Sequence, residues 1–362
     1  MVSKARQLAQ SASAPEGRKN VVTNGAMQVA QRSTSVTGIG ASDGYFTVDR
    51  FNINVNGTSG RLTMTQTADG PSGFANCIKL DCTTADTDMD ANKFIILEQR
   101  FEGQDLQRFM KGTSDAKEYA VSFYVKGNAS ATYVVELFDS DNSRQVSKTF
   151  SVTTSWTRVE LTFPADTTGA FDDDNAQSLN LHLWLVSGTT YTSGTLSQTW
   201  TSNSGNNANR AVGGDNFFSS TDNTFFITGM QLEVGSVATE FEHRSFGEEL
   251  QLCKRYYNRT TRSGNDNVYF GVAQVNSSTV AYAIEKWEVA MRANPTFGIS
   301  AATDAELFGA MGAKQSSAVS LLVDGTQNGL ISITVASGLT QDNAVRAYLR
   351  SADAFYELDA EL

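Results

Sequence analysis

Hydrophobic and polar residues alternate along most of this chain, the pattern of β-strands in which successive side chains point to opposite faces. The clearest stripe is formed by four leucines, Leu179, Leu181, Leu183 and Leu185. Similar alternation runs through residues 119–125, 133–137 and 157–163, and turn sequences rich in Gly, Asn and Asp separate these stretches. Strands with one apolar and one polar face are typical of antiparallel sheets partly open to solvent. The pattern predicts an all-β fold, with a jelly-roll β-sandwich over residues 21–245.

A second, smaller β domain is predicted for residues 246–362. Its expected strands cover residues 267–275, 279–290, 317–323, 329–335, 344–351 and 355–358. A short linker helix is expected to open it, because Ser245 and Glu248 have the spacing of a capping box and apolar residues then recur at helical intervals. Before this helix, Gly229 interrupts the alternation of an expected strand at 225–234 and predicts a bulge.

Residues 1–20 differ from both domains. They hold four cations against one acid, Glu16; the cations are Lys4, Arg6, Arg18 and Lys19. An apolar stripe follows one helical face, but it is too weak to hold a helix together alone. One interpretation is a frayed tail. The interpretation we favour is a short helical or extended anchor that folds against other subunits or another partner.

Whole-chain composition limits the partners and the compartment. The chain has 362 residues and a formal net charge of −11, which disfavours nucleic acid because phosphate binding needs a basic surface. Its three cysteines, Cys77, Cys82 and Cys253, lack the spacing of a disulfide framework, so we expect reduced structural thiols. No stretch has the apolar length of a membrane span or a signal peptide. We therefore expect synthesis in a cytoplasm and no membrane insertion.

Catalysis is not expected from the titratable residues. The two histidines, His182 and His243, lie near no nucleophile motif and are interpreted as structural or surface residues. Acids that could act in pairs on a glycosidic bond, namely Asp139, Asp141 and residues 172–174, lie in expected turns. Acids in turns usually cap or solvate the chain, so we expect no enzyme activity.

Three alternate acids suggest a metal as an open alternative. Asp86, Asp88 and Asp90 imitate the start of an EF-hand loop, but Ala91 stands where that loop needs Gly and Leu97 where it needs Glu. A structural calcium completed by a distant strand is the alternative that this pattern leaves open. We expect no other cofactor.

Ring-bearing side chains point to the polar faces of three expected strands. His182 and Trp184 lie opposite the leucine stripe, Tyr124 lies on a second strand, and Trp156 and Arg158 lie on a third. A sugar ring stacks its apolar C–H face on an aromatic plane and forms hydrogen bonds at its polar edges. If the three strands are neighbours, these residues form one glycan-binding face. The alternative is that a neighbouring subunit covers them.

Two other regions compete for a binding role. The second domain carries Tyr282 and Trp287, together with Tyr269 and Tyr348. Residues 189–223 form a long segment rich in Ser, Thr, Asn and Gly, which we expect to be a functional loop or a contact between subunits, because such residues supply little core burial.

Six segments of the chain resemble bacteriophage tail-fibre and tail-spike proteins. The segments are NVVTNGAMQVAQRST, GYFTVDRF, LEQRFEGQDLQRFMKGTSDAKEYAVSFYVK, TTGAFDDDNAQSLNLHLWLVSGTTYTS, GMQLEVGSVATEFEHRSFGEELQLCKRYY and AYLRSADAFYELDAEL. In that family they belong to a carbohydrate-binding-like jelly roll and a C-terminal β domain. The resemblance spans residues 20–362 and implies the same two-domain order here.

The resemblance also implies a function. It indicates a tail protein of the virion that is assembled in the host cytoplasm, forms a homotrimer and contacts other tail proteins through residues 1–20. Its expected role is attachment to a host surface receptor, either a glycan or a protein. Two alternatives stay open: a structural virion protein, such as a head decoration or tail scaffold subunit, and, more remotely, a polysaccharide depolymerase.

Overall fold

The computed structural model describes residues 18–264 and 268–362. The predicted anchor therefore lies outside the described residues, except for its last three positions. The chain divides into a first unit that ends at Glu249 and a second unit that begins at Leu250, inside the linker helix rather than before it. Both units consist mainly of β-strands, which confirms the predicted all-β class.

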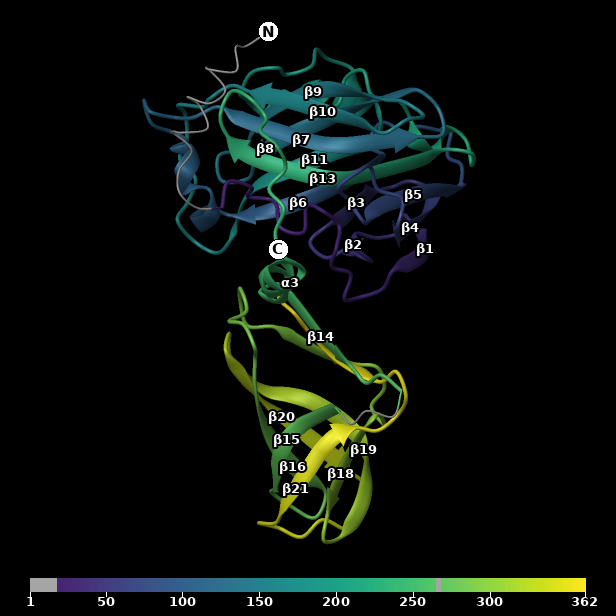
Figure 1. Ribbon diagram of the computed structural model, residues 1–362, viewed down its shortest axis with the longest axis vertical. Helices are drawn as coiled ribbons and strands as arrows, with labels where there is room; N and C mark the ends of the chain where they lie inside the picture. The colour runs from purple at the N-terminus through teal and green to yellow at the C-terminus, as the bar shows by residue number, and fades with distance from the viewer. Residues whose placement is uncertain (1–17, 265–267) are drawn as a thin grey trace. The chain divides into compact units, whose positions relative to one another are not determined.

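The first unit is a sandwich of two antiparallel sheets (Figure 1). Within the described residues, one sheet has six strands in the order β1 (Ser35–Ile39), β4 (Arg61–Thr67), β5 (Cys77–Thr84), β13 (Thr224–Val234), β7 (Tyr119–Gly127) and β10 (Thr157–Phe163). The other has seven described strands in the order β12 (Thr201–Ser202), β9 (Arg144–Val152), β8 (Ala131–Asp139), β11 (Gln177–Ser187), β6 (Phe94–Glu102), β3 (Asn52–Asn56) and β2 (Gly44–Tyr45).

The core lies between the two sheets and is built from the alternate positions that the sequence indicates. The four leucines of β11 are fully buried, and they join Val121, Phe123 and Val125 of β7 in one hydrophobic cluster. Each large apolar side chain removed from water stabilises the fold by about 1.5–3 kcal/mol. Because the period of a strand is two, the residues between these positions must point away from the core.

The bulge predicted at Gly229 is confirmed. Its φ is +64°, a conformation that glycine adopts at little cost, and the pairing of β13 with β7 shifts register between Thr228 and Gln231. A Cβ atom at Gly229 would lie 2.8 Å from Phe74 Cζ and 2.9 Å from Tyr124 Cδ2. The bulge therefore lets these two rings lie against the backbone.

The last residues of the predicted anchor are part of the first unit. The carboxylate of Glu242 accepts hydrogen bonds from the backbone N–H groups of Lys19 and Asn20, at 2.7 and 2.8 Å. The Asn20 side chain is buried and bonds to the backbone of Met230 and Leu232. Residues 18–20 therefore belong structurally with the sandwich.

The linker helix α3 (Phe246–Lys254) begins where the capping-box spacing places it. The Glu248 N–H donates to Ser245 Oγ at 3.3 Å, which satisfies one of the free N–H groups of the first turn. The Glu248 carboxylate pairs with Arg18 at 3.0 Å. No helix in the described parts of the chain is both long and apolar enough to cross a membrane.

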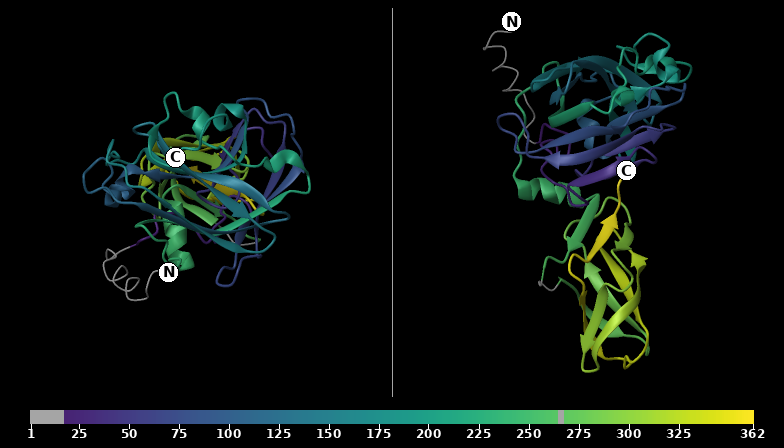
Figure 2. Two further views of the ribbon diagram at one scale, coloured as in Figure 1. Left: turned by 90° about the horizontal axis from the view of Figure 1, so that it is seen from above. Right: turned by 90° about the vertical axis from the view of Figure 1, so that its right-hand side faces the viewer.

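The second unit combines a closed barrel with a small sheet, and the right-hand view of Figure 2 shows its strands in green to yellow. In the described residues the barrel order is β15 (Val268–Val275), β16 (Val280–Lys286), β20 (Asn328–Val335), β19 (Gly312–Asp324), β18 (Ala305–Gly309) and β21 (Ala344–Leu349). The small sheet pairs β14 (Tyr257–Thr261), β22 (Phe355–Asp359) and β17 (Thr296–Ile299). Closure pairs both edges of the barrel sheet and leaves none exposed.

Replacing Gly229 tests the bulge. We expect Gly229→Ala to lower the free energy of unfolding by about 2 kcal/mol, because alanine is strained at this φ and its Cβ meets two rings. The matched control is Gly247→Ala in α3, where an added Cβ meets nothing within 4 Å. Urea unfolding measures both, and equal stability of the two variants would contradict the role of Gly229.

Candidate functional site

The outer face of the six-stranded sheet carries a row of rings and cations. Phe226 of β13 pairs with Lys79 of β5 on one side and with Lys126 of β7 on the other. The Lys126 ammonium lies 4.6 Å from the centroid of the Phe226 ring and 5.3 Å from that of Trp156, which directly precedes β10. Cross-strand neighbours of this kind stabilise one another, and each ring keeps part of its surface exposed.

A second row on the same face contains Tyr124 and Arg158, which are directly paired between β7 and β10. Their chain neighbours Val125 and Val159 point into the core, so both side chains point outward. We call the six residues Lys79, Tyr124, Lys126, Trp156, Arg158 and Phe226 the ring–cation face. Figure 1 shows β7, β10 and β13, which carry most of it, side by side.

One edge of this face is closed by the connection from β13 to α3. Residues 235–243 fold back over the sheet, where Thr162 Oγ1 donates to the Ser236 carbonyl at 3.1 Å and Arg158 donates to the Thr239 carbonyl. Phe241 and His243 then pack against Phe74, with ring centroids 5.0 Å away in each case. The interpretation of His243 as a packed surface residue agrees with these contacts.

Every cation of the ring–cation face has an acidic partner. Lys79 pairs with Asp81 at 2.8 Å, Lys126 with Asp69 at 2.7 Å, and Arg158 with Glu160 at 2.6 Å. The face thus presents partly exposed rings beside donors and acceptors whose charges balance. Rings with flanking polar groups are the combination that sugar recognition requires.

The ligand-binding residues that the sequence predicts for the first unit lie on two different sheets. The structure brings Tyr124, Trp156 and Arg158 together, as predicted, whereas His182 and Trp184 lie on β11 in the other sheet. Both are buried, with 4% and 1% of their surfaces exposed. Their predicted exposure was wrong, because the segment that follows β11 places Tyr191, Ala211 and Arg210 against Trp184.

The covering segment also differs from its prediction. Although polar, it buries Tyr191 of α2 (Thr189–Thr192) and Ala211 against Trp184, in a small hydrophobic cluster with Ile96 and Val134. The Tyr191 and Trp184 ring centroids are 5.0 Å apart. The segment therefore supplies core burial of its own.

A buried ion network lies beneath this cover. The Glu136 carboxylate accepts hydrogen bonds from His182 Nδ1 at 2.8 Å, Trp184 Nε1 at 2.9 Å, and Arg210 Nε and Nη2 at 2.7 and 2.8 Å. On the other side of the imidazole, His182 Nε2 lies 2.8 Å from Glu98, which also pairs with Arg100. Sequence analysis missed this network, whose members lie far apart in the chain.

The network shifts the pKa values of its members. Burial raises the pKa of Glu136, but the charge of Arg210 and the hydrogen bond from His182 outweigh burial and hold the pKa at about 2. Burial lowers the pKa of His182, but its contacts with Glu136 and Glu98 outweigh burial and raise the pKa above the ordinary 6.5. The protonated imidazole is therefore the form that the two carboxylates stabilise.

The predicted metal ligands surround a lysine instead. Lys93 Nζ lies 3.3 Å from Asp86 and 3.4 Å from Asp90, and it donates to the Asp88 carbonyl. Burial raises the pKa of Asp86, but hydrogen bonds from Ser59, Thr58 and Lys93 outweigh it and lower the pKa to about 2. Among the described residues no group of three or more His, Cys, Asp or Glu could hold a metal. The cation that these acids imply is an ammonium group of the chain itself.

A second internal lysine explains an acid that we expected in a solvated turn. Asp139 is fully buried, with its carboxylate 2.5 Å from Lys111 Nζ. The same ammonium lies 3.2 Å from Asp166 and donates to the carbonyls of Thr168 and Gly169 at 2.8 and 2.6 Å. Asp139 is thus fixed in an ion pair and is not placed to act on a substrate.

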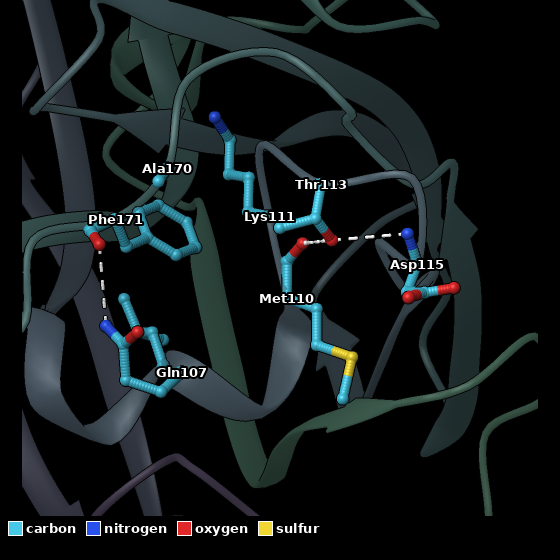
Figure 3. Close-up of a pocket in the computed structure, with 8 residues that line it drawn as sticks. Gln107, Met110, Lys111, Thr113, Asp115, Ala170 and Phe171 are labelled. Atoms are coloured by element: carbon cyan, nitrogen blue, oxygen red, sulfur yellow. Dashed lines mark hydrogen bonds between the residues drawn. The ribbon is translucent and has the colours of Figure 1, made fainter.

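The surface hollow beside Lys111, of about 370 Å³, lacks the chemistry of a built site (Figure 3). Leu106, Met110 and Phe171 supply apolar walls, and the Gln107 amide is bonded to backbone carbonyls. The Lys111 ammonium turns away from the hollow toward its carboxylates. The polar groups at this hollow are largely committed to the protein itself.

Trp287 and Tyr282, the two residues of the second unit that we predicted to bind a ligand, differ in their exposure. Trp287 is buried, and its Nε1–H donates to the Gly325 carbonyl at 2.8 Å. The prediction that its ring is exposed to a ligand was therefore wrong. Tyr282 is half-buried and lines a shallow hollow of about 430 Å³ on the barrel surface. Val272 and Ile284 beside it are 69% and 70% exposed. This part of the barrel is an apolar surface.

Comparisons with known proteins give no family. No protein-family model and no curated protein sequence matches the chain. A structure described as "CBM4 structure and function" has 11% identity and a TM-score of 0.30, and the match covers 59% of this chain and 99% of that one. The tailspike protein 4 enzymatically active domain of bacteriophage CBA120 has 10% identity and a TM-score of 0.30, over 59% of this chain and 21% of that one.

A third structure is a family 11 carbohydrate-binding module from Clostridium thermocellum in complex with a β-1,3-1,4-mixed-linked tetrasaccharide. Its identity is 11% and its TM-score 0.29, over 57% of this chain and 99% of that one. Identities and TM-scores this low carry no argument about this chain. The fold is therefore established by the strands of the chain itself, and a function has to be argued from its surface.

His182 provides a test of the buried network. We expect His182→Gln to lower the free energy of unfolding by about 3 kcal/mol at pH 6, because it removes a buried cation from between two carboxylates. The folded-state pKa of His182 is raised, so its stabilisation is complete below about pH 6.5 and is lost as pH rises through the folded pKa. The variant should lack this decline.

The matched control for that test is His243→Gln, which changes the other histidine of the chain at an exposed position. We expect it to change stability by less than about 0.5 kcal/mol. Urea titrations at several pH values measure both variants. If His182→Gln keeps the stability and pH dependence of the parent protein, the network is not stabilising in the way described.

Proposed function

We propose that this chain is a bacteriophage tail-fibre protein that attaches the virion to a glycan on the host surface, without catalysis. The ring–cation face is the observation that carries the proposal. Trp156 and Phe226 offer ring surface for the apolar face of a sugar, and the flanking ion pairs offer donors and acceptors to its hydroxyl groups. A sheet holds these groups in fixed register, which favours recognition by a preformed surface.

The location and partners of the protein are proposed from the resemblance of its sequence to tail-fibre and tail-spike proteins. On this proposal the chain is assembled in the host cytoplasm and becomes part of the virion tail. Residues 1–20 contact other tail proteins, and neither nucleic acid nor a membrane interior is a partner. The net charge of −11 supports the exclusion of nucleic acid.

We propose a homotrimer as the assembled form. Copies that each carry a net charge of −11 repel one another, so a stable contact between them needs an uncharged surface. The exposed Val272, Ile284 and Leu322 of the barrel offer such a surface, because exposed apolar groups gain free energy when they are covered.

A second candidate function is a structural role in the virion, as a head decoration or tail scaffold subunit. The structural role is supported by the rings of the ring–cation face, which are half-buried and would be covered fully by a neighbouring virion protein. The two functions differ in their ligand: attachment needs a host glycan, whereas a scaffold needs only virion proteins.

A depolymerase would release reducing sugar from host polysaccharide, which a colorimetric assay detects.

Attachment is tested by binding the labelled protein to host cells. We expect binding that periodate treatment of the cells abolishes, and a loss of about tenfold in affinity for Trp156→Ala, the value of one stacked ring at about 1.4 kcal/mol. Tyr269→Ala is the control, because Tyr269 is a partly exposed ring in the second unit. Periodate-resistant binding, or equal loss in both variants, would exclude glycan attachment through this face.

The proposed anchor is tested by deleting residues 1–17, which leaves Lys19 and Asn20 bonded to Glu242. We expect the shortened protein to fold and to sediment at three times the mass of one chain, as the full protein should. We also expect it to be missing from virions assembled in its presence. Normal incorporation would refute the anchor, and a monomer in both forms would refute the homotrimer.

A further inference from the structure

We propose that the ring–cation face binds an uncharged polysaccharide chain that runs across the strands of the six-stranded sheet. This inference rests on the proposed function and adds two properties of the ligand, its charge and its direction. The first follows from the ion pairs of the face and the second from the cross-strand order of its residues.

The charge of the ligand follows from the pairing of each cation. A polyanion binds where cations are free to release their counterions, but Lys79, Lys126 and Arg158 are each within 2.6–2.8 Å of a carboxylate. An anionic sugar would have to displace those carboxylates and approach a chain of net charge −11. A hydroxyl group can instead bond to both members of an ion pair without breaking it.

The direction of the ligand follows from the register of the strands. The outward row that contains Lys79, Phe226, Lys126 and Trp156 continues on the other side of Lys79. Thr65 of β4 pairs with Lys79, and Ser35 of β1 pairs with Thr65. The row therefore crosses all strands of the sheet, and five inter-strand intervals span about 24 Å. That length accommodates several sugar rings in a chain.

The two ends of this row differ in chemistry. Trp156 and Phe226 form a ring end, whose centroids are 6.2 Å apart. Ser35 and Thr65 form a hydroxyl end, with their oxygens 3.1 Å apart at an exposed position. A neutral chain can stack at the first end and form hydrogen bonds at the second. The segment 235–243 crosses the neighbouring part of the face, so a chain directed along the strands would meet it.

The class of ligand is tested with an array of defined polysaccharides. The uncharged members are dextran, mannan and galactan, and the anionic members are polysialic acid, polygalacturonate and alginate. We expect binding to at least one uncharged member and to none of the anionic members. We also expect the affinity to change less than about twofold between low and high salt, because no counterions are released.

The outcomes separate this inference from the function on which it rests. Salt-dependent binding to anionic members alone would contradict the inference that the ligand is uncharged, but would be consistent with glycan attachment. Binding to no member of the array, together with periodate-resistant binding to host cells, would overturn both. Equal binding to uncharged and anionic members would also overturn the charge argument.

A triple variant tests the charge argument without depending on the natural ligand. Asp69→Asn, Asp81→Asn and Glu160→Gln together release the three cations at partly exposed positions, where folding should be retained. We expect the variant to gain at least about tenfold in affinity for polysialic acid. If the parent protein already binds polysialic acid as tightly as the variant does, the paired acids do not exclude anions.

Thr65→Val tests the direction. Loss of one hydroxyl contact should weaken binding of the long bound polysaccharide about three- to tenfold, and should leave its trisaccharide fragment, held at the ring end, unchanged. Trp156→Ala should weaken binding of both lengths. A Thr65→Val variant that binds the long chain like the parent protein would overturn the direction across the strands.

Discussion

A two-sheet sandwich has one core but two outer faces, and this constraint shapes the first unit. The inward side chains of both sheets pack into the same hydrophobic cluster. In the seven-stranded sheet, the segment that follows β11 buries the outward side chains His182 and Trp184, and its Arg210 bonds to Glu136. The six-stranded sheet covers only part of its outer face, with residues 235–243. The face that remains open is the one that carries rings beside balanced charges.

Local pattern was sufficient to predict which residues point inward, but not which outward residues are exposed. His182 and Trp184 share the alternation of Tyr124 and Lys126, and both pairs point away from the core. What separates them is Arg210, which reaches Glu136 from 74 positions away and lies over the Trp184 ring. No period of two or 3.6 residues encodes such a contact, because it depends on where a long connection folds back. The short strands β14 and β17 escaped prediction for a related reason: each pairs with β22, which is distant in the sequence.

The calcium alternative shows another limit of sequence reasoning. Asp86, Asp88 and Asp90, whose spacing suggests metal ligands, lie around the Lys93 ammonium in the structure. Lys111 occupies a similar position between Asp139 and Asp166. A buried ammonium loses much hydration free energy, and the surrounding carboxylates and carbonyls offset that loss only while all of them are in place. Both lysines therefore fix the loops that supply their ligands, a task that a bound metal performs in other proteins.

The site of the ring–cation face within the sheet determines how selective it can be. Its side chains stand on neighbouring strands whose register is fixed by backbone hydrogen bonds, so their spacing cannot adapt to a ligand as loops do. The bulge at Gly229 ends the regular pairing of β13 and β7 just beyond Thr228, where Phe74 lies against the sheet. Along the strands, a ligand on this face would meet the bulge and residues 235–243 on one side, whereas the described residues form no such barrier across the strands. Selection by length and by charge along one direction is what a rigid face with these boundaries can provide.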